Sequence, residues 1–164
     1  METILQEIER ALDAHLYYLA VAMVLTLPDI CAALASADGE SSGQRYRDWY
    51  DANLAAAYPH MTAQDCWKLR CGVLHQGQCG HPQMQYARVI FTIPNAQRIV
   101  FHNNILNDAL NLDAPTFCMD VVRRVRVWYA RSQHQRNVRT NLPNLVQLRP
   151  TGLAPYIVGA PLIA

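Results

Sequence analysis

Apolar residues at the start of the chain recur at three- and four-residue steps, the spacing of one face of an α-helix. This stripe consists of Ile4, Leu5, Ile8, Leu12, Leu16, Leu19 and Met23. Its second half has few polar positions, which predicts burial on most sides. Pro28 is expected to end the helix, because proline removes a hydrogen bond and clashes with the preceding turn. The pattern predicts one long helix over residues 3–26, with a short helix over 29–34 after it.

Three further helices are predicted over residues 44–57, from Thr62 to about 76, and from 113 or 116 to about 134. The second has the clearest start, because Thr62-Ala63-Gln64-Asp65 has the form of a capping box. In that arrangement the threonine accepts from the first amides, and the acid three positions on reaches back. Gly77 follows the last periodic residues, which is typical of a helix end.

The hydrophobic period changes between residues 88 and 102. Residues 88–93 and 98–102 are rich in β-branched and aromatic residues, and Pro94-Asn95-Ala96-Gln97 joins them. Two such runs around a short polar turn predict a β-hairpin. A lone hairpin is marginal in water, so one of its faces is expected to pack on the helices. Residues 103–112 are expected to form a loop with a helical turn.

The last 24 residues, 141–164, hold four prolines and many apolar side chains without a period. They are expected to lie extended on the domain or on a partner, since an apolar tail left free would be adhesive. The predicted fold is therefore mainly α: a helical domain over 1–140 with a β-hairpin insertion at 88–102, and a C-terminal tail over 141–164.

Composition supports one globular domain and gives little indication of a partner. The chain has 164 residues, 51% of them hydrophobic, and a net charge of +1, so no overall field draws it to nucleic acid or membrane. Charge is uneven, however: seven arginines and no acid lie between Arg123 and Arg149. That stretch is either a basic, phosphate-binding face or an ordinary solvated helix face.

The cysteines and the apolar run favour a cytoplasmic protein. Five cysteines at irregular spacings (Cys31, Cys66, Cys71, Cys79 and Cys118) are typical of free thiols in a reducing compartment. The apolar run 16–27 is too short to span a bilayer, and an acidic segment precedes it where a signal peptide would be basic. We expect a core helix and no membrane partner.

The strongest candidate chemistry is the pair Arg70 and His75, in the segment Leu69-Arg70-Cys71-Gly72-Val73-Leu74-His75-Gln76-Gly77. Arg10 and His15 have the same spacing, and roughly one such match is expected by chance. Context separates the pairs, since Arg70 and His75 lie in the last turns of a capped helix. Five helical positions turn through about 140°. Convergence therefore needs a long arginine reach or a last turn loosened at Gly72 and Gly77.

This segment resembles the signature of the HEPN superfamily (higher eukaryotes and prokaryotes nucleotide-binding). Its members are small helical bundles with an Arg-x(4–6)-His motif near the end of a helix. Many are metal-independent endoribonucleases that act as dimers with facing motifs, often as toxins or phage-defence effectors. The resemblance implies catalytic Arg70 and His75, RNA as substrate, a homodimer, no cofactor, and an antitoxin or other protein partner. Cys71 departs from the Asn, Asp or His usual after the arginine in active members.

The residue types suit metal-free RNA cleavage. Histidine can serve as base for the 2′-hydroxyl or as acid for the leaving oxygen, and the planar arginine matches phosphate oxygens. One histidine per chain is not enough for both proton transfers, and a symmetric dimer would supply a second histidine. In the competing interpretation, Arg70 pairs with an acid such as Asp65 or Asp48 and His75 caps helix carbonyls. The protein would then be a non-catalytic helical dimerisation module whose tail docks a partner.

Further polar residues are secondary candidates. Cys71, Gln76, His102 and Asn103 are predicted to support the motif or contact substrate, although asparagines after a strand more often form turns or caps. A zinc site is not expected, because the spacing of Cys66, Cys71, His75, Cys79 and His81 matches no common zinc module.

Overall fold

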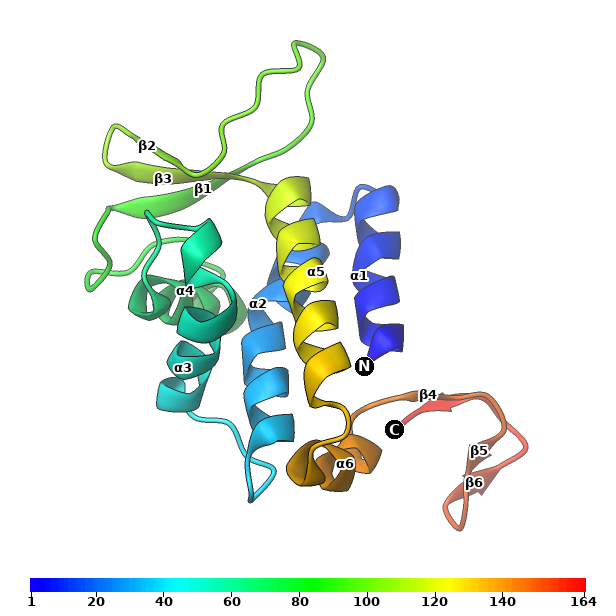
Figure 1. Cartoon of the computed structure of the whole chain (residues 1–164). Helices are drawn as coiled ribbons and strands as arrows, with labels where there is room; N and C mark the ends of the chain where they lie inside the picture. Colours follow the sequence, from blue (N-terminus) through cyan, green and yellow to red (C-terminus); the bar gives the residue numbers. More distant parts are fainter.

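The computed structural model describes all residues, 1–164, and the protein is mainly α, as predicted (Figure 1). Its helices are α1 (Glu2–Asp13), α2 (Tyr17–Ala35), α3 (Gly43–Asn53), α4 (Ala63–Gln76), α5 (Ala114–Ser132) and α6 (Arg136–Asn141), with short 3-10 turns at Ala55–Ala57 and Leu142–Asn144. The strands are β1 (Arg88–Thr92), β2 (Asn104–Leu106), β3 (Ala109–Asp113), β4 (Leu148–Arg149), β5 (Gly152–Leu153), β6 (Ile157–Val158) and β7 (Leu162–Ile163).

Helix α2 is the centre of the bundle. It packs against α1, α3, α4, α5 and α6, and six of its nine buried residues join a core of 28 buried residues. Three aromatic side chains, Tyr46 and Tyr50 of α3 and Phe117 of α5, are fully buried beside it. Because α2 is the least polar helix, it gains most from a central position in which other helices cover several of its faces.

The predicted single helix over 3–26 is wrong. The chain breaks at residues 14–16, where His15 adopts a left-handed backbone (φ 58°). The predicted apolar stripe does not stay in the core across the break: Leu5 and Ile8 of α1 are buried, whereas Leu16, Leu19 and Met23 are exposed. Pro28 does not end α2 either: it is buried inside the helix, which runs on to Ala35. Packing of α2 on five neighbours outweighs the one backbone hydrogen bond that proline forfeits.

The expectation that the apolar segment is too short to span a bilayer is wrong, because α2 extends beyond the run 16–27 on which it was based. With 19 residues and a mean hydropathy of 1.9, Tyr17–Ala35 is one helix long and apolar enough to cross a membrane, by length and composition only. Half of it is buried within the bundle. A core helix of a soluble domain passes the same length and composition test.

The predicted hairpin between 88–93 and 98–102 is also wrong. Strand β1 pairs in parallel with β3, and the hairpin joins β2 to β3, which gives the order β1-β3-β2. Its turn residues, Asn107 and Asp108, have φ of 48° and 60°, as in the turns that suit hairpins. Residues 103–112, expected to form a loop with a helical turn, therefore hold β2 and most of β3. All five residues of β3 are buried.

Helices α3, α4 and α5 confirm their predictions closely. Thr62 and Asp65 form the expected capping box of α4, and Gly77 ends it with a left-handed backbone (φ 65°). Asp113 caps α5 by accepting from the amide of Thr116. Local capping chemistry thus sets both ends of the helix that carries the candidate motif.

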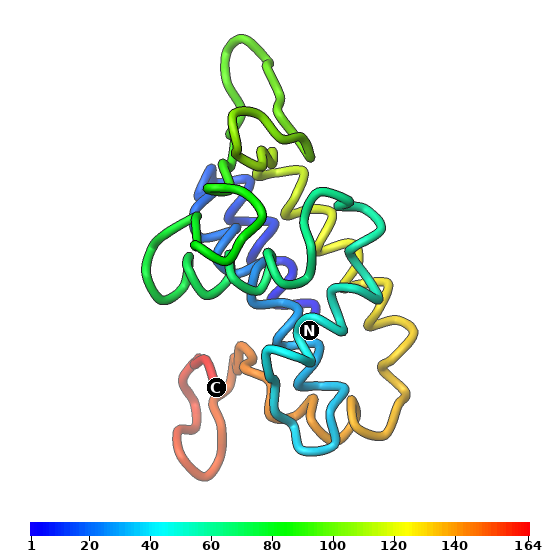
Figure 2. The backbone as a smooth tube through the Cα atoms, turned by 90° about the vertical axis from the view of Figure 1, so that its left-hand side faces the viewer, coloured from blue at the N-terminus to red at the C-terminus, as the bar shows by residue number.

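Residues 141–164 leave α6 and form two small antiparallel pairs, β4 with β7 and β5 with β6. This tail projects from one end of the molecule, and the loop between β1 and β2 projects from the other (Figure 2). Val146, Leu148 and Ile163, at the base of the tail, line a groove together with α1 and α2. The tip is largely exposed, including Tyr156 and Val158.

Candidate functional site

Arg70 and His75 meet at the exposed end of α4. The Nη1 atom of Arg70 lies 3.1 Å from Nε2 of His75. Because a guanidinium can only donate, this contact requires an unprotonated Nε2, and the imidazole proton then lies on Nδ1. The two side chains that the spacing singles out are therefore in direct contact, and the histidine is open to solvent.

A third residue, Asp29 of α2, holds the arginine in place. Its Oδ2 accepts from Nε of Arg70 at 2.8 Å, and its Oδ1 accepts from the hydroxyl of Ser41 at 2.9 Å. The side chains of Arg70 and Asp29 are only 20% and 15% exposed. The ring of Trp67 lies 5.1 Å from the guanidinium carbon and adds a cation–π contact. One edge of the guanidinium is thus fixed by the bundle, and Nη1 reaches the histidine.

Arg70 does pair with an acid, as the competing interpretation expected, but that acid is Asp29 and neither of the two examples named, Asp65 and Asp48. Asp65 accepts from Thr62 and Gln85, and Asp48 accepts from Gln44. His75 contacts Arg70, and the end of α4 is closed by backbone amides. The amides of Gly77 and Gln78 both donate to the carbonyl of Gly72.

Gly72 has a different role from the one its position indicated. Helix α4 is regular to Gln76, so no loosened turn brings the pair together, and the length of Arg70 suffices. A Cβ at residue 72 would lie 2.7 Å from the backbone oxygen of Gln78. Glycine therefore allows the segment after α4 to fold back across the helix.

The secondary candidates are divided between two places. Cys71 is half-buried with a free thiol, and Gln76 is exposed, both on α4 beside the pair. His102 instead accepts from the amide of Asp113 at 3.1 Å and packs edge-on against Tyr58. Asn103 donates to the carbonyl of Ala57. His102 thus braces the start of α5, Asn103 ties the chain to the 3-10 turn Ala55–Ala57, and neither contacts Arg70 or His75.

Asp29, Ser41 and Trp67 are the site residues that the sequence does not reveal. The one usable signal was Asp29 itself, a lone acid in the most apolar helix. A carboxylate in such a helix needs a charged partner, although the sequence gives no indication that Arg70 provides it. Its position directly after Pro28 made a helix start the simpler interpretation.

All five cysteines are free thiols, and none belongs to a group of side chains that could bind a metal ion. No group of three or more His, Cys, Asp or Glu side chains is placed to hold a metal ion. Burial raises the pKa of Cys66 to about 12, and that of Cys118 to about 12. Both remain protonated at neutral pH, whereas a metal ligand or nucleophile is a thiolate.

The arginine-rich stretch is partly neutralised. Arg126 donates to both Glu2 and Glu9 of α1, and Arg123 pairs with Asp120. Arg124 is exposed and has no acidic partner. In the suggested basic face, Arg123 and Arg126 are thus neutralised by acidic residues of the same molecule.

Comparisons with protein-family models, with curated proteins and with solved structures give no match to this chain. The functional interpretation accordingly rests on the geometry of Asp29, Arg70 and His75.

Proposed function

We propose that this protein is a HEPN-type RNA-binding and RNA-cleaving protein, a metal-independent endoribonuclease with Arg70 and His75 at its centre. The observation that carries the proposal is the 3.1 Å contact between the two side chains at an exposed helix end, with the arginine fixed by Asp29. A preorganised cation beside a histidine is the arrangement that phosphoryl transfer without a metal needs.

Each residue has a defined part in the proposed reaction. A phosphate oxygen, being charged, is a stronger acceptor than imidazole and takes the Nη1 donor of Arg70. Nε2 of His75 is then free to remove the proton of the 2′-hydroxyl. The 2′-oxygen bonds to phosphorus, and the bond from phosphorus to the 5′-oxygen breaks. The leaving oxygen takes a proton from a second histidine, which yields a 2′,3′-cyclic phosphate and a 5′-hydroxyl.

A second copy of the chain would supply that second histidine. His75 is exposed, and no other histidine contacts Arg70. We therefore propose a homodimer across the motif face, acting on RNA in the cytoplasm. A toxin or phage-defence role, restrained by an antitoxin, is the cellular setting that fits such an enzyme.

A different observation favours the alternative of a non-catalytic interaction module. Helices α1 and α2 and the base of the tail enclose an apolar groove of about 790 Å³. Exposed apolar side chains around it include Leu19, Leu148 and Ile163. Such a surface is typical of protein–protein contacts.

One comparison separates the two functions. Purified protein is incubated with tRNA and mixed RNA in EDTA, beside His75→Asn and the matched control His15→Asn. His15 has the same spacing from an arginine, and asparagine tolerates its left-handed backbone. Loss of a general base costs roughly 100- to 10,000-fold. We expect that loss for His75→Asn only, with cyclic phosphate ends in the wild-type products.

Intact RNA after incubation with wild-type protein would contradict the nuclease proposal. Equal cleavage by wild type and His75→Asn would contradict it as well, because the activity would then not depend on His75. In either case the interaction module becomes the better interpretation.

A further inference from the structure

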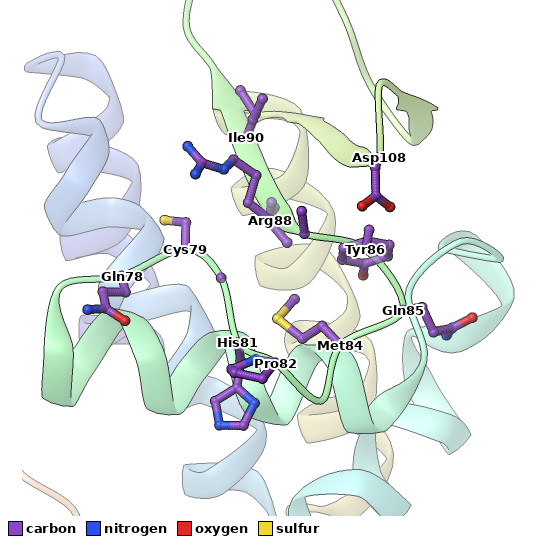
Figure 3. Close-up of a pocket in the computed structure, with 13 residues that line it drawn as sticks. Gln78, Cys79, His81, Pro82, Met84, Gln85, Tyr86, Arg88, Ile90 and Asp108 are labelled. Carbon is purple, nitrogen blue, oxygen red and sulfur yellow. The ribbon is translucent and has the colours of Figure 1, made fainter.

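A cavity of about 810 Å³ lies beside the end of α4, between the segment that follows the motif and the small sheet (Figure 3). Residues 78–82 and 84–90, together with Asp108 of the β2–β3 turn, line it. Gln78, on its wall, is three residues from His75. A cavity of this size falls in the range of small-molecule sites.

The wall of this cavity is held by backbone and side-chain contacts. The amide of Val89 donates to the carbonyl of Cys79 at 2.7 Å, which closes the loop on itself. The amide and side chain of Gln85 both donate to Asp65, the residue that also caps α4. A cavity whose wall is already ordered loses little conformational entropy when a ligand binds.

Two opposite charges line the cavity without pairing. Arg88 extends from β1 and Asp108 from the neighbouring turn, and Figure 3 shows the guanidinium directed away from the carboxylate. Neither side chain makes an ion pair or a hydrogen bond, and both are exposed. An unpaired guanidinium suits a phosphate, and an unpaired carboxylate accepts from the amino group of a base.

We propose that this cavity binds one unpaired nucleotide of single-stranded RNA, adjacent to the phosphate held by Arg70 and His75. Arg88 contacts a flanking phosphate, and Asp108 accepts from the exocyclic amino group of the base. Only unpaired RNA can place a base in such a cavity. Adenine, cytosine and guanine carry an amino group and uracil does not, so the cavity disfavours uracil. This inference rests on the proposed ribonuclease function.

Binding is measured in the His75→Asn background, so that the RNA stays intact. Fluorescence anisotropy follows labelled ten-nucleotide oligomers of adenosine, cytidine or uridine. Arg88→Ala is expected to weaken binding of all three about tenfold. In the Asp108→Asn variant the side-chain amide can donate a hydrogen bond to uracil, and asparagine tolerates the left-handed backbone at residue 108. It is expected to reduce the preference for cytidine over uridine at least fivefold.

The matched control is Arg10→Ala on α1, an exposed arginine outside the arginine-rich stretch, for which less than a twofold change is expected. Circular dichroism melts confirm that each variant is folded. An equal loss of affinity at Arg10 and Arg88, unchanged selectivity in Asp108→Asn, or no binding of any oligomer would overturn the cavity proposal.

Cleavage assays run in parallel distinguish this inference from the proposed function. If wild type cuts RNA and the Arg88 and Asp108 variants bind as their parent does, the nuclease stands and the nucleotide cavity is wrong. If the binding effects occur but His75→Asn cuts as wild type does, the cavity stands and the assignment of His75 is wrong.

Discussion

The chain contains the same Arg-x4-His spacing twice, and the fold uses the two copies differently. Arg10 turns back to Glu7, three positions away on α1, at 2.7 Å. His15 turns forward, with Nδ1 2.8 Å from the hydroxyl of Tyr17. Arg70 and His75 instead meet each other. Identical spacing thus gives two locally satisfied surface residues in one region and a joined pair in the other.

The difference lies in what surrounds each arginine. Arg10 is 71% exposed and has a partner from its own helix, whereas Arg70 is mostly buried against Asp29, which is 41 residues distant in sequence. The backbone differs too: α1 ends at Asp13, before its histidine, while α4 continues past His75 to Gln76. A spacing motif becomes a site only where the helix spans it and another element fixes one member.

The largest predicted effect is at Gly72, two residues after Arg70. The equivalent position in the other pair is Leu12, in an ordinary stretch of helix. In an ordinary helix, glycine to alanine stabilises by about 1 kcal/mol. At Gly72 the new Cβ would lie 2.7 Å from the backbone oxygen of Gln78. We expect Gly72→Ala to lower the free energy of unfolding by about 2–3 kcal/mol, because backbone must move. Urea denaturation measures it, and a gain in stability would show that the chain does not cross here.

The next effect is the coupling between each arginine and its acid, measured by double-mutant cycles with alanine. Asp29 with Arg70 is expected to give about 1–2 kcal/mol, because both side chains are largely withdrawn from water. Glu7 with Arg10 should give under about 0.5 kcal/mol, as exposed pairs on one helix do. Equal coupling energies in the two cycles would mean that Asp29 does not anchor the motif.

The sequence predicted α4 well because its ends depend on neighbours in the chain. The capping box of Thr62 and Asp65 and the left-handed Gly77 are local chemistry that the residue types disclose. The same holds for the start of α5 at Asp113. The contact between Arg70 and His75 could be anticipated on the same grounds, as two long side chains on one helix end.

Features that depend on distant parts of the chain could not be predicted. The partner of β1 is β3, whose residues are separated from it by an 11-residue loop and β2. The apolar run at 98–102 indicated a nearer pairing partner for β1, yet β3 is the strand that is buried in the core. Asp29 is a similar case, since a charge inside an apolar helix indicates that a partner exists without indicating which one.

The smallest predicted effect tests whether an ion pair between residues distant in sequence stabilises the fold when its side chains are not buried. Arg126 of α5 donates to Glu9 and Glu2 of α1, far apart in sequence, but its side chain is 37% exposed. We expect Arg126→Ala to cost only about 0.5–1 kcal/mol at neutral pH, because water and salt screen the pair. The hydrogen bond from Arg126 lowers the pKa of Glu9 below its ordinary 4.5. The stabilisation is therefore complete above that value and is lost as pH falls through the folded-state pKa. Thermal melts of wild type and Arg126→Ala should converge in acid, and a pH-independent difference would show that packing of the arginine, rather than its charge, joins α5 to α1.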